Sequence, residues 1–126
     1  MNATEPGKKT ILIVDDSPLI VERLIDMLED LDNLAWIKNA GNYADAVIAI
    51  SENNPDIFLL DINLPDKSGI EILPIIKENN PSAKVIMITN QGNEYYQKLC
   101  MKLGADYFID KSKEFDQIAA IIAAMP

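Results

Sequence analysis

The stretch IFLLDINLPD, residues 57–66, decides how this chain folds. Its first four residues are all apolar, and the run stops at the carboxylate of Asp61. A segment that is apolar at every position is typical of a strand buried on both faces, as in a parallel sheet covered by helices. Such sheets carry their chemistry at the carboxyl ends of the strands, and Asp61 stands at such an end. Asn-Leu-Pro-Asp, residues 63–66, then turns the chain.

Five strand patterns alternate with five helix patterns on either side of this stretch. The strands are predicted at residues 10–14, 35–40, 57–61, 84–89 and 107–110, and the helices at residues 18–29, 43–53, 69–78, 94–103 and 113–124. The alternation predicts an α/β fold: a five-stranded parallel sheet with helices on both faces, flavodoxin-like, in the strand order 2-1-3-4-5. A Rossmann half-domain is disfavoured because no Gly-rich loop follows the first strand.

Local signals refine these elements. Ser17 followed by Pro18 predicts an N-cap and a first helical residue, and Asn42 predicts the cap of the second helix. Pro74 is expected to kink the third helix, and Gly104 to close the fourth as its C′ residue. The second helix is expected to place four residues on one face: Ala44, Val47, Ile48 and Ser51.

Length and composition indicate one soluble globular domain. Of 126 residues, 48% are hydrophobic and 25% are charged, which suits a single domain over residues 10–126. Residues 1–9 are polar and contain Pro6-Gly7, so we expect them to form a flexible tail. No apolar run is long enough to span a bilayer, and the first residues lack the apolar core of a secretory signal. The single cysteine, Cys100, excludes an internal disulfide and is expected in the core, so we expect a cytoplasmic location.

Charge and the absence of histidine narrow the chemistry. A net charge of -9 argues against nucleic acid or an anionic membrane as a direct partner. Without histidine the chain has neither Ser-His-Asp nor Cys-His machinery, and no His-based zinc site. Any bound metal would therefore take oxygen ligands, which favours Mg²⁺, Mn²⁺ or Ca²⁺.

Four of the predicted strands end at, or just before, a polar residue. Asp15 and Asp16 follow the first strand, Asp61 ends the third, Thr89 ends the fourth, and Lys111 follows the fifth. Strands lie about 4.8 Å apart, so this order places all of them along one rim, with only a long side chain such as Lys111 able to reach across. Each residue alone also fits a plainer role, as a capping loop, a turn, a strand end or a solvated lysine.

The gathering of three carboxylates at one rim favours a cation. Two such charges ~5 Å apart at an effective dielectric of 20 repel by about 3 kcal/mol, which a hard ion such as Mg²⁺ would neutralise. We predict that Asp61 is a nucleophile that accepts a phosphoryl group as an acyl phosphate. The ion and Lys111 would counter the developing charge, and the Thr89 hydroxyl would donate a hydrogen bond to a phosphoryl oxygen.

Over residues 10–124 the chain resembles a response-regulator receiver domain (CheY-like) of two-component signalling. The resemblance implies that Asp61 takes its phosphoryl group from a phosphohistidine of a histidine kinase or a histidine phosphotransfer protein. It implies that Mg²⁺ (or Mn²⁺) binds Asp16, Asp61 and the backbone carbonyl of Asn63, with Asp15 acting mainly through water. The resemblance rests on these residues: Asp15, Asp16, Asp61, Pro65, Gly69, Thr89, Gly104, Ala105 and Lys111.

The resemblance also implies a switch and shows two departures. Thr89 and Phe108 would couple the phosphate to an output surface over residues 94–124. Ser112 stands where the family usually has a proline after a cis peptide, which leaves the geometry of that loop open, and Asn90 stands where a small residue is usual. Two carboxamides are expected to influence the rate of dephosphorylation: Asn63 and Gln91.

The leading hypothesis is a stand-alone receiver: a phosphorylation-driven switch that catalyses only its own phosphorylation and dephosphorylation and acts on a downstream protein target or in a phosphorelay. A receiver fragment of a larger regulator would have the same sequence features. A small Mg²⁺-dependent phosphohydrolase with an Asp nucleophile is disfavoured because Asp-x-Asp does not follow the first strand. A flavodoxin-type FMN binder is disfavoured because a hydroxyl- and glycine-rich phosphate loop is missing there.

Overall fold

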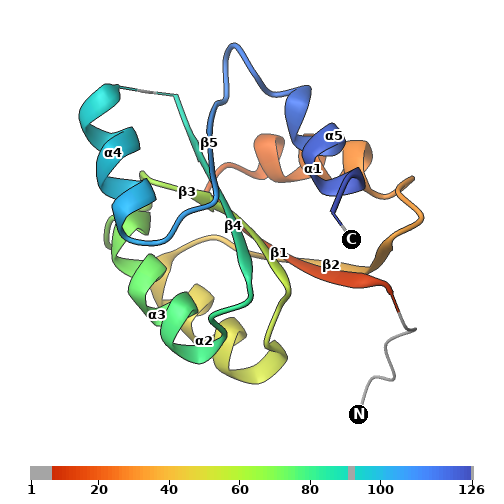
Figure 1. Ribbon diagram of the computed structural model, residues 1–126, viewed down its shortest axis with the longest axis horizontal. Coiled ribbons are helices and arrows are strands. Elements are labelled where there is room, and N and C mark those ends of the chain that lie inside the picture. The colour runs from red at the N-terminus through yellow and green to blue at the C-terminus, as the bar shows by residue number, and fades with distance from the viewer. Residues whose placement is uncertain (1–6, 91–92, 126) are drawn as a thin grey trace.

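The computed structural model describes residues 7–90 and 93–125 of the chain, and in this part five parallel strands form one sheet (Figure 1). The order is β2-β1-β3-β4-β5, which confirms the predicted doubly wound topology. The strands are β1 (Lys9–Val14), β2 (Leu34–Ala40), β3 (Ile57–Asp61), β4 (Lys84–Thr89) and β5 (Tyr107–Asp110). Because all five run parallel, their carboxyl ends share one rim of the sheet.

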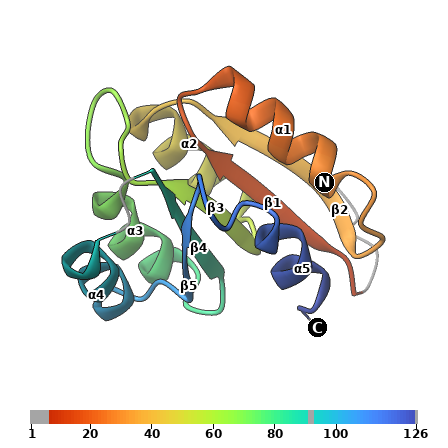
Figure 2. The same ribbon diagram turned by 90° about the horizontal axis from the view of Figure 1, so that it is seen from above.

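Helices cover both faces of the sheet (Figure 2). α1 and α5 lie over one face, and α2, α3 and α4 over the other. The bounds are α1 (Pro18–Leu28), α2 (Tyr43–Asn53), the 3₁₀ turn η1 (Gly69–Glu71), α3 (Ile72–Asn79), α4 (Glu94–Lys102) and α5 (Gln117–Ala123). No helix in the described part of the chain is long and apolar enough to cross a membrane.

The two cores explain why β3 is apolar at every position. Phe58 and Leu60 point into the core under α2, α3 and α4, whereas Ile57 and Leu59 point into the core under α1 and α5. All four are at most 1% exposed, so neither face of β3 meets water. Cys100 is fully buried in the first core, as predicted, and this burial raises the pKa of its thiol.

The predicted caps are confirmed. Ser17 Oγ accepts a hydrogen bond from the Ile20 N–H, with Pro18 as the first residue of α1, and Asn42 Oδ1 accepts from the Asp45 N–H. Gly104 has a φ of +112° after α4, and its N–H donates to the carbonyl of Met101. A left-handed glycine with this bond is the usual closing of a helix, and it turns the chain into β5.

The third helical segment differs from the prediction of one kinked helix. Residues 69–71 form a 3₁₀ turn, and α3 begins only at Ile72. Pro74 therefore lies in the first turn of α3, where backbone N–H groups have no partner within the helix, and the ring removes no interior hydrogen bond. The prediction that Pro74 lies inside the helix and kinks it was wrong, because the helix starts later than its apolar pattern suggested.

The last helix and the face of α2 also correct the prediction. α5 begins at Gln117 rather than at residue 113, because hydrogen bonds among Asp110, Ser112 and Glu114 hold residues 111–116 in turns. The buried residues of α2 are Ala46 and Ile50, and the predicted face is largely exposed, Ile48 to 54%. The helix has apolar residues on two sides, and only its placement on the sheet decides which side is covered.

Candidate functional site

Three carboxylates meet at the carboxyl-end rim of the sheet. Asp15 follows β1 and is 1% exposed, Asp61 ends β3 and is 4% exposed, and Asp16 is open to solvent. One oxygen from each lies within 4.8 Å of the others. The Ser17 N–H donates to Asp15 Oδ1 at 2.9 Å, so the start of α1 fixes this carboxylate in place. The acidic pocket predicted from the sequence is therefore present.

Lys111 follows β5, the edge strand two places from β3, and its side chain reaches along the rim to this pocket. Its Nζ lies 2.6 Å from Asp15 Oδ2 and 3.2 Å from Asp61 Oδ2, and its side chain is 5% exposed. The backbone N–H of Lys111 donates to the carbonyl of Thr89 at 2.8 Å, which continues the pairing of β5 with β4 by one residue. This register starts the lysine stem at the rim, so its four-carbon chain spans the distance to β1 and β3.

Burial and charge act in opposite directions on Asp61. Its burial raises the pKa of the carboxyl above the usual range, because a buried charge loses hydration. The Lys111 ammonium lowers this pKa, and the nearby Asp15 carboxylate raises it again. The Asn63 N–H, which donates to Asp61 Oδ1 at 3.2 Å, favours the ionised form. The net shift is upward, so a further positive charge would help to keep Asp61 ionised.

The pocket fits a hard divalent cation. Asp15 Oδ2 is buried, and the Lys111 ammonium at 2.6 Å is its one ion-pair partner within the described chain, so it has lone pairs left for a cation. Oxygens on opposite sides of an octahedral Mg²⁺ are about 4.2 Å apart, so the three carboxylates need only a small rotation to share one ion. Asp16, which is exposed, has the freedom to make this rotation. The donor set consists of oxygens alone, which suits Mg²⁺ or Mn²⁺.

Of the other predicted residues, Thr89 and Asn63 lie at the same rim as this pocket, and Phe108 lies two residues before the end of β5. Thr89 is buried at the end of β4, and Asn63 follows β3 with its side chain exposed. Phe108 is half-buried on β5, opposite Met87, and packs against the core under α2, α3 and α4. Gln91 lies outside the described residues.

Ser112 orders the loop after β5, at the position where the receiver-like sequences usually have a proline. The Lys111–Ser112 peptide is trans. Both the N–H and the hydroxyl of Ser112 donate to Asp110 Oδ1, at 2.8 and 2.6 Å, and these bonds hold the pKa of Asp110 below its usual range. The Asp110 N–H in turn donates to Glu114 Oε1 at 3.1 Å. This network orders the loop that carries Lys111.

Sequence reasoning missed the contact that fastens the β3–α3 loop. Asp66 Oδ1 accepts from the Tyr43 N–H at 2.8 Å, and Asp66 Oδ2 accepts from the Ala44 N–H at 3.1 Å. Asp66 thus caps α2 from a distant loop, while Lys67 Nζ lies 4.7 Å from the centre of the Tyr43 ring. The acidic turn residue was visible in the sequence, but its partners are 22 and 23 positions away.

Replacing Asp66 by asparagine should loosen the start of α2. An amide has one acceptor oxygen, so one of the two N–H groups loses its partner. The bond from the Tyr43 N–H is the main cause that lowers the pKa of Asp66, so its stabilising effect is present above the ordinary Asp range. This stabilisation of the start of α2 should be lost as the pH falls below about 4, because Asp66 is then protonated.

Amide hydrogen exchange at Tyr43 and Ala44 measures this change. We expect lower protection factors, which are exchange rates corrected for the intrinsic effect of pH, in Asp66→Asn at pH 7 and in the parent protein at the lower pH. Asp45→Asn is the matched control, because Asp45 lies in the same helical turn but does not accept from these two N–H groups. Unchanged exchange in Asp66→Asn would contradict the capping role.

Replacing Lys111 by methionine should destabilise the metal-free protein by about 3 kcal/mol, because it leaves two buried carboxylates without their cation. Added Mg²⁺ should restore part of this loss. Urea unfolding with and without Mg²⁺ measures both effects, and Lys113→Met, which changes an exposed lysine two residues on, is the control. Equal stability of the two variants without Mg²⁺ would show that Lys111 does not neutralise the pocket.

Comparison with known proteins agrees with this arrangement. Residues 11–123 match the family described as the response regulator receiver domain. The chain is 38% identical over 103 residues to the chemotaxis protein CheY of Halobacterium salinarum, a match that covers 82% of this chain and 84% of that protein. It is 29% identical to the DNA-binding transcriptional activator EvgA of Escherichia coli over 90% of this chain but 55% of that protein. The chain thus spans about half the length of the transcriptional regulators that it matches.

Two solved structures show the same architecture. A CheY-like receiver domain protein of Methanospirillum hungatei has a TM-score of 0.81 and 28% identity over 91% of each chain. The CheX–CheY complex of Borrelia burgdorferi, which contains BeF₃ and Mg²⁺, has a TM-score of 0.76 and 32% identity over 90% of this chain and 89% of that one. With its strand order, its acidic pocket and this match over nearly all its length, the chain belongs to the response regulator receiver domain family.

Proposed function

We propose that this receiver domain is a phosphorylation-driven binding switch whose acceptor is Asp61. As a receiver it is a module of two-component signalling and not a conventional enzyme. The observation that carries the proposal is the position of Lys111 Nζ, which lies within 3.2 Å of carboxylate oxygens of both Asp15 and Asp61 at the rim of the sheet. Membership of the receiver family supports a phosphohistidine as the donor, on a histidine kinase or a histidine phosphotransfer protein. That histidine belongs to another protein, because this chain contains none.

In the proposed reaction an Asp61 carboxylate oxygen attacks the phosphorus, and the phosphorus–nitrogen bond of the donor breaks. The electron pair of that bond stays with the donor imidazole, and Asp61 becomes an acyl phosphate. Lys111 counters the added negative charge, and the Thr89 hydroxyl donates to a phosphoryl oxygen. A bound Mg²⁺ (or Mn²⁺) would supply further charge neutralisation, held by Asp15, Asp16, Asp61 and the backbone carbonyl of Asn63.

The signal then passes to a protein target in our proposal. Thr89 and Phe108 change position together when the phosphate arrives, and the surface over residues 94–124 changes its affinity for that target. Asn63 and Gln91 adjust the rate at which water removes the phosphoryl group. We place this exchange in the cytoplasm, where a lone buried thiol such as Cys100 stays reduced.

Mass spectrometry after incubation with acetyl phosphate and Mg²⁺ tests the proposal. We expect one added phosphoryl unit per chain, and none when the Mg²⁺ is removed by chelation. Release of many phosphates per chain from a small phosphate ester would instead indicate a phosphohydrolase. No added unit under any condition would contradict the proposal.

The role of Asp16 is tested by metal binding. Because Asp16 is exposed, Asp16→Ala should leave the fold intact while removing one carboxylate ligand. We expect the affinity for Mg²⁺ to fall by more than about tenfold, measured by calorimetric titration. Asp26→Asn removes another exposed charge from the neighbouring helix without touching the pocket and should keep the parent affinity. Equal affinities of the two variants would remove Asp16 from the metal site.

A further inference from the structure

The outer edge of β2 is open to solvent. β2 ends the described sheet and pairs only with β1, so the backbone groups of its other side face outward. Proteins usually protect such an edge with proline, a β-bulge or a projecting lysine. The pairing of β2 with β1 shifts register between Lys9 and Thr10, and from Trp36 to Ala40 it is regular, so this second part of β2 is the open edge. Residues 34–40 contain no proline, and their one lysine, Lys38, is turned aside: its Nζ lies 2.8 Å from Asn53 Oδ1 and 4.7 Å from the centre of the Trp36 ring.

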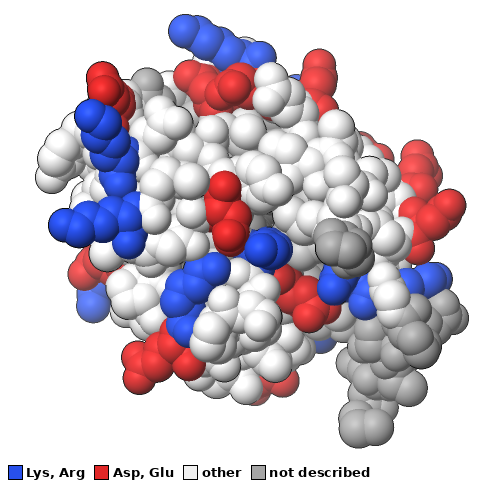
Figure 3. Space-filling view, viewed as in Figure 1, with Lys and Arg blue, Asp and Glu red and all other residues white. Residues whose placement is uncertain are grey.

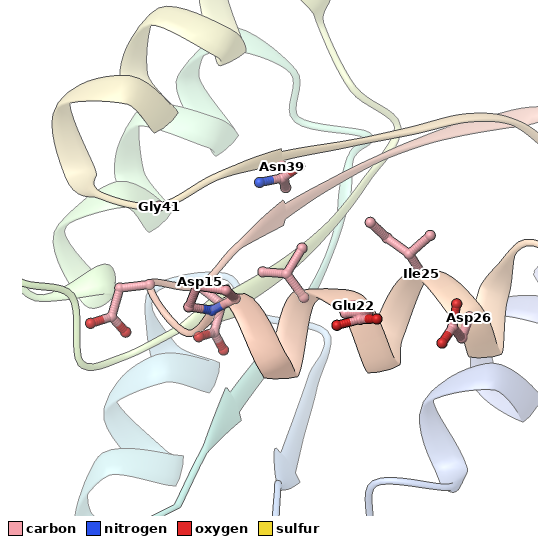
Figure 4. Close-up of a pocket in the computed structure, with 9 residues that line it drawn as sticks. Asp15, Glu22, Ile25, Asp26, Asn39 and Gly41 are labelled. Atoms are coloured by element: carbon pink, nitrogen blue, oxygen red, sulfur yellow. The ribbon is translucent and has the colours of Figure 1, made fainter.

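A groove lies on each side of this edge. The first, about 360 Å³, runs between α1 and β2 from the acidic pocket outward. Figure 4 shows Ile25 pointing from α1 toward β2, with Glu22 and Asp26 along the same helix and Asn39 on the strand. The second groove, about 400 Å³, lies between β2 and α2 and is lined by Ile48. The two grooves share Asn39 and Gly41, so they flank one end of the same strand.

The residues that line the grooves carry only negative charge. Six of them are acidic and none is basic: Asp15, Asp16, Glu22 and Asp26 in the first groove, and Asp45 and Glu52 in the second. The one arginine of α1, Arg23, stacks 4.3 Å from the centre of the Phe115 ring, on the side of α5. Figure 3 shows basic side chains over α4 and others at the lower right, beside the start of β1 and β2, so the acidic grooves lie toward the opposite end of β2. Asp15 is already paired with Lys111, and Asp15 and Asp16 belong to the acidic pocket. The negative charge left for a partner is therefore that of Glu22, Asp26, Asp45 and Glu52, and it attracts cations.

We propose that the β2 edge is a docking site for an extended, basic segment of a partner protein, which pairs with β2 as an added strand. Successive side chains of a strand point to opposite faces of the sheet, so neighbouring residues of the segment enter different grooves. Each groove offers an apolar floor and carboxylates, and it takes one apolar and one Lys or Arg side chain. A helix laid on α1 would fill the first groove only. The surface lies at the opposite edge of the sheet from β5 and does not depend on the proposed phosphoryl transfer.

A capped peptide of two Lys-Val-Ile-Lys units is the probe, because its pattern presents one apolar and one basic side chain per unit to each face. Titration into the ¹⁵N-labelled protein should shift the amide signals of residues 36–41, 21–26 and 45–52. Higher salt should weaken binding. The matched peptide with glutamate in place of lysine should not bind. Shifts confined to residues 94–123, no shifts at all, or equal binding of the glutamate peptide would each overturn the proposal.

Two pairs of variants separate charge from shape. Glu22→Gln with Asp26→Asn should weaken the peptide about threefold to tenfold, whereas Glu71→Gln with Glu78→Gln, the same charge change on the 3₁₀ turn and α3, should not. Ile48→Ser changes a side chain that is 54% exposed, so it keeps the fold and should also weaken binding, unlike Leu19→Ser, whose side chain is 66% exposed outside both grooves. If Ile48→Ser has no effect, the segment does not bind as an added strand.

Discussion

Asp61→Asn is expected to abolish the addition of a phosphoryl group from acetyl phosphate. The amide that replaces the carboxylate is a poor nucleophile. Asp61 is the last residue of β3, belongs to the acidic cluster and lies 3.2 Å from Lys111 Nζ, so it is the proposed acceptor. Mass spectrometry in Mg²⁺ should therefore show only the unmodified chain. Asp26→Asn is the control, because Asp26 is exposed on α1 and lies outside the acidic cluster, and this variant should still be modified. Modification of Asp61→Asn at the parent level would place the acceptor elsewhere.

The stability of the same variant separates a lost nucleophile from a lost fold. Burial raises the pKa of Asp61, so the folded protein holds this proton more tightly than the unfolded chain does. Stability of the parent then falls as the pH rises from the ordinary Asp value through the raised one. Asp61→Asn lacks this slope and should be at least as stable as the parent at neutral pH. Urea unfolding between pH 4 and 7 without metal measures the difference, and a clearly less stable variant would contradict the stated cause of the shift.

Gly69→Ala is expected to have the largest effect on stability. A Cβ at this position would lie 1.8 Å from the carbonyl oxygen of Asp61, 2.9 Å from its carbonyl carbon and 3.3 Å from the Cα of Ile62. All three are backbone atoms, so no side chain can turn aside. The Gly69 N–H also donates to the Ile62 carbonyl at 2.7 Å, which pins the loop against the end of β3. We expect a loss of at least about 3 kcal/mol in the free energy of unfolding.

The Mg²⁺ affinity of this variant should fall as well, because the displaced loop carries Asn63. Urea unfolding and calorimetric titration measure the two effects. Gly41→Ala is the matched control: its Cβ would meet no atom within 4 Å, so its stability should stay within about 0.5 kcal/mol of the parent. If Gly69→Ala were tolerated equally well, the close approach of residue 69 to Asp61 would not constrain the loop.

Local patterns predicted the sheet because each signal acts within a few residues. The apolar run before Asp61 requires burial on both faces, and Ser17, Asn42 and Gly104 end or begin helices through bonds to residues at most four positions away. The strand order then follows from the alternation of elements, and it brings Asp15, Asp16 and Asp61 to one rim. The acidic pocket could therefore be anticipated without coordinates.

Features that depend on contacts between distant segments could not be anticipated in this way. Asp66 caps α2 across more than 20 residues, and Gly69 is needed because the loop returns to the backbone of Asp61. α2 carries apolar side chains on two sides, and its docking on the sheet buries Ala46 and leaves Ile48 exposed beside β2. Turns, local helix caps and the apolar run of a buried strand depend on neighbours along the chain. A cap from a distant loop, a close backbone approach and the choice of the buried helix face depend on which segments the packed core brings together.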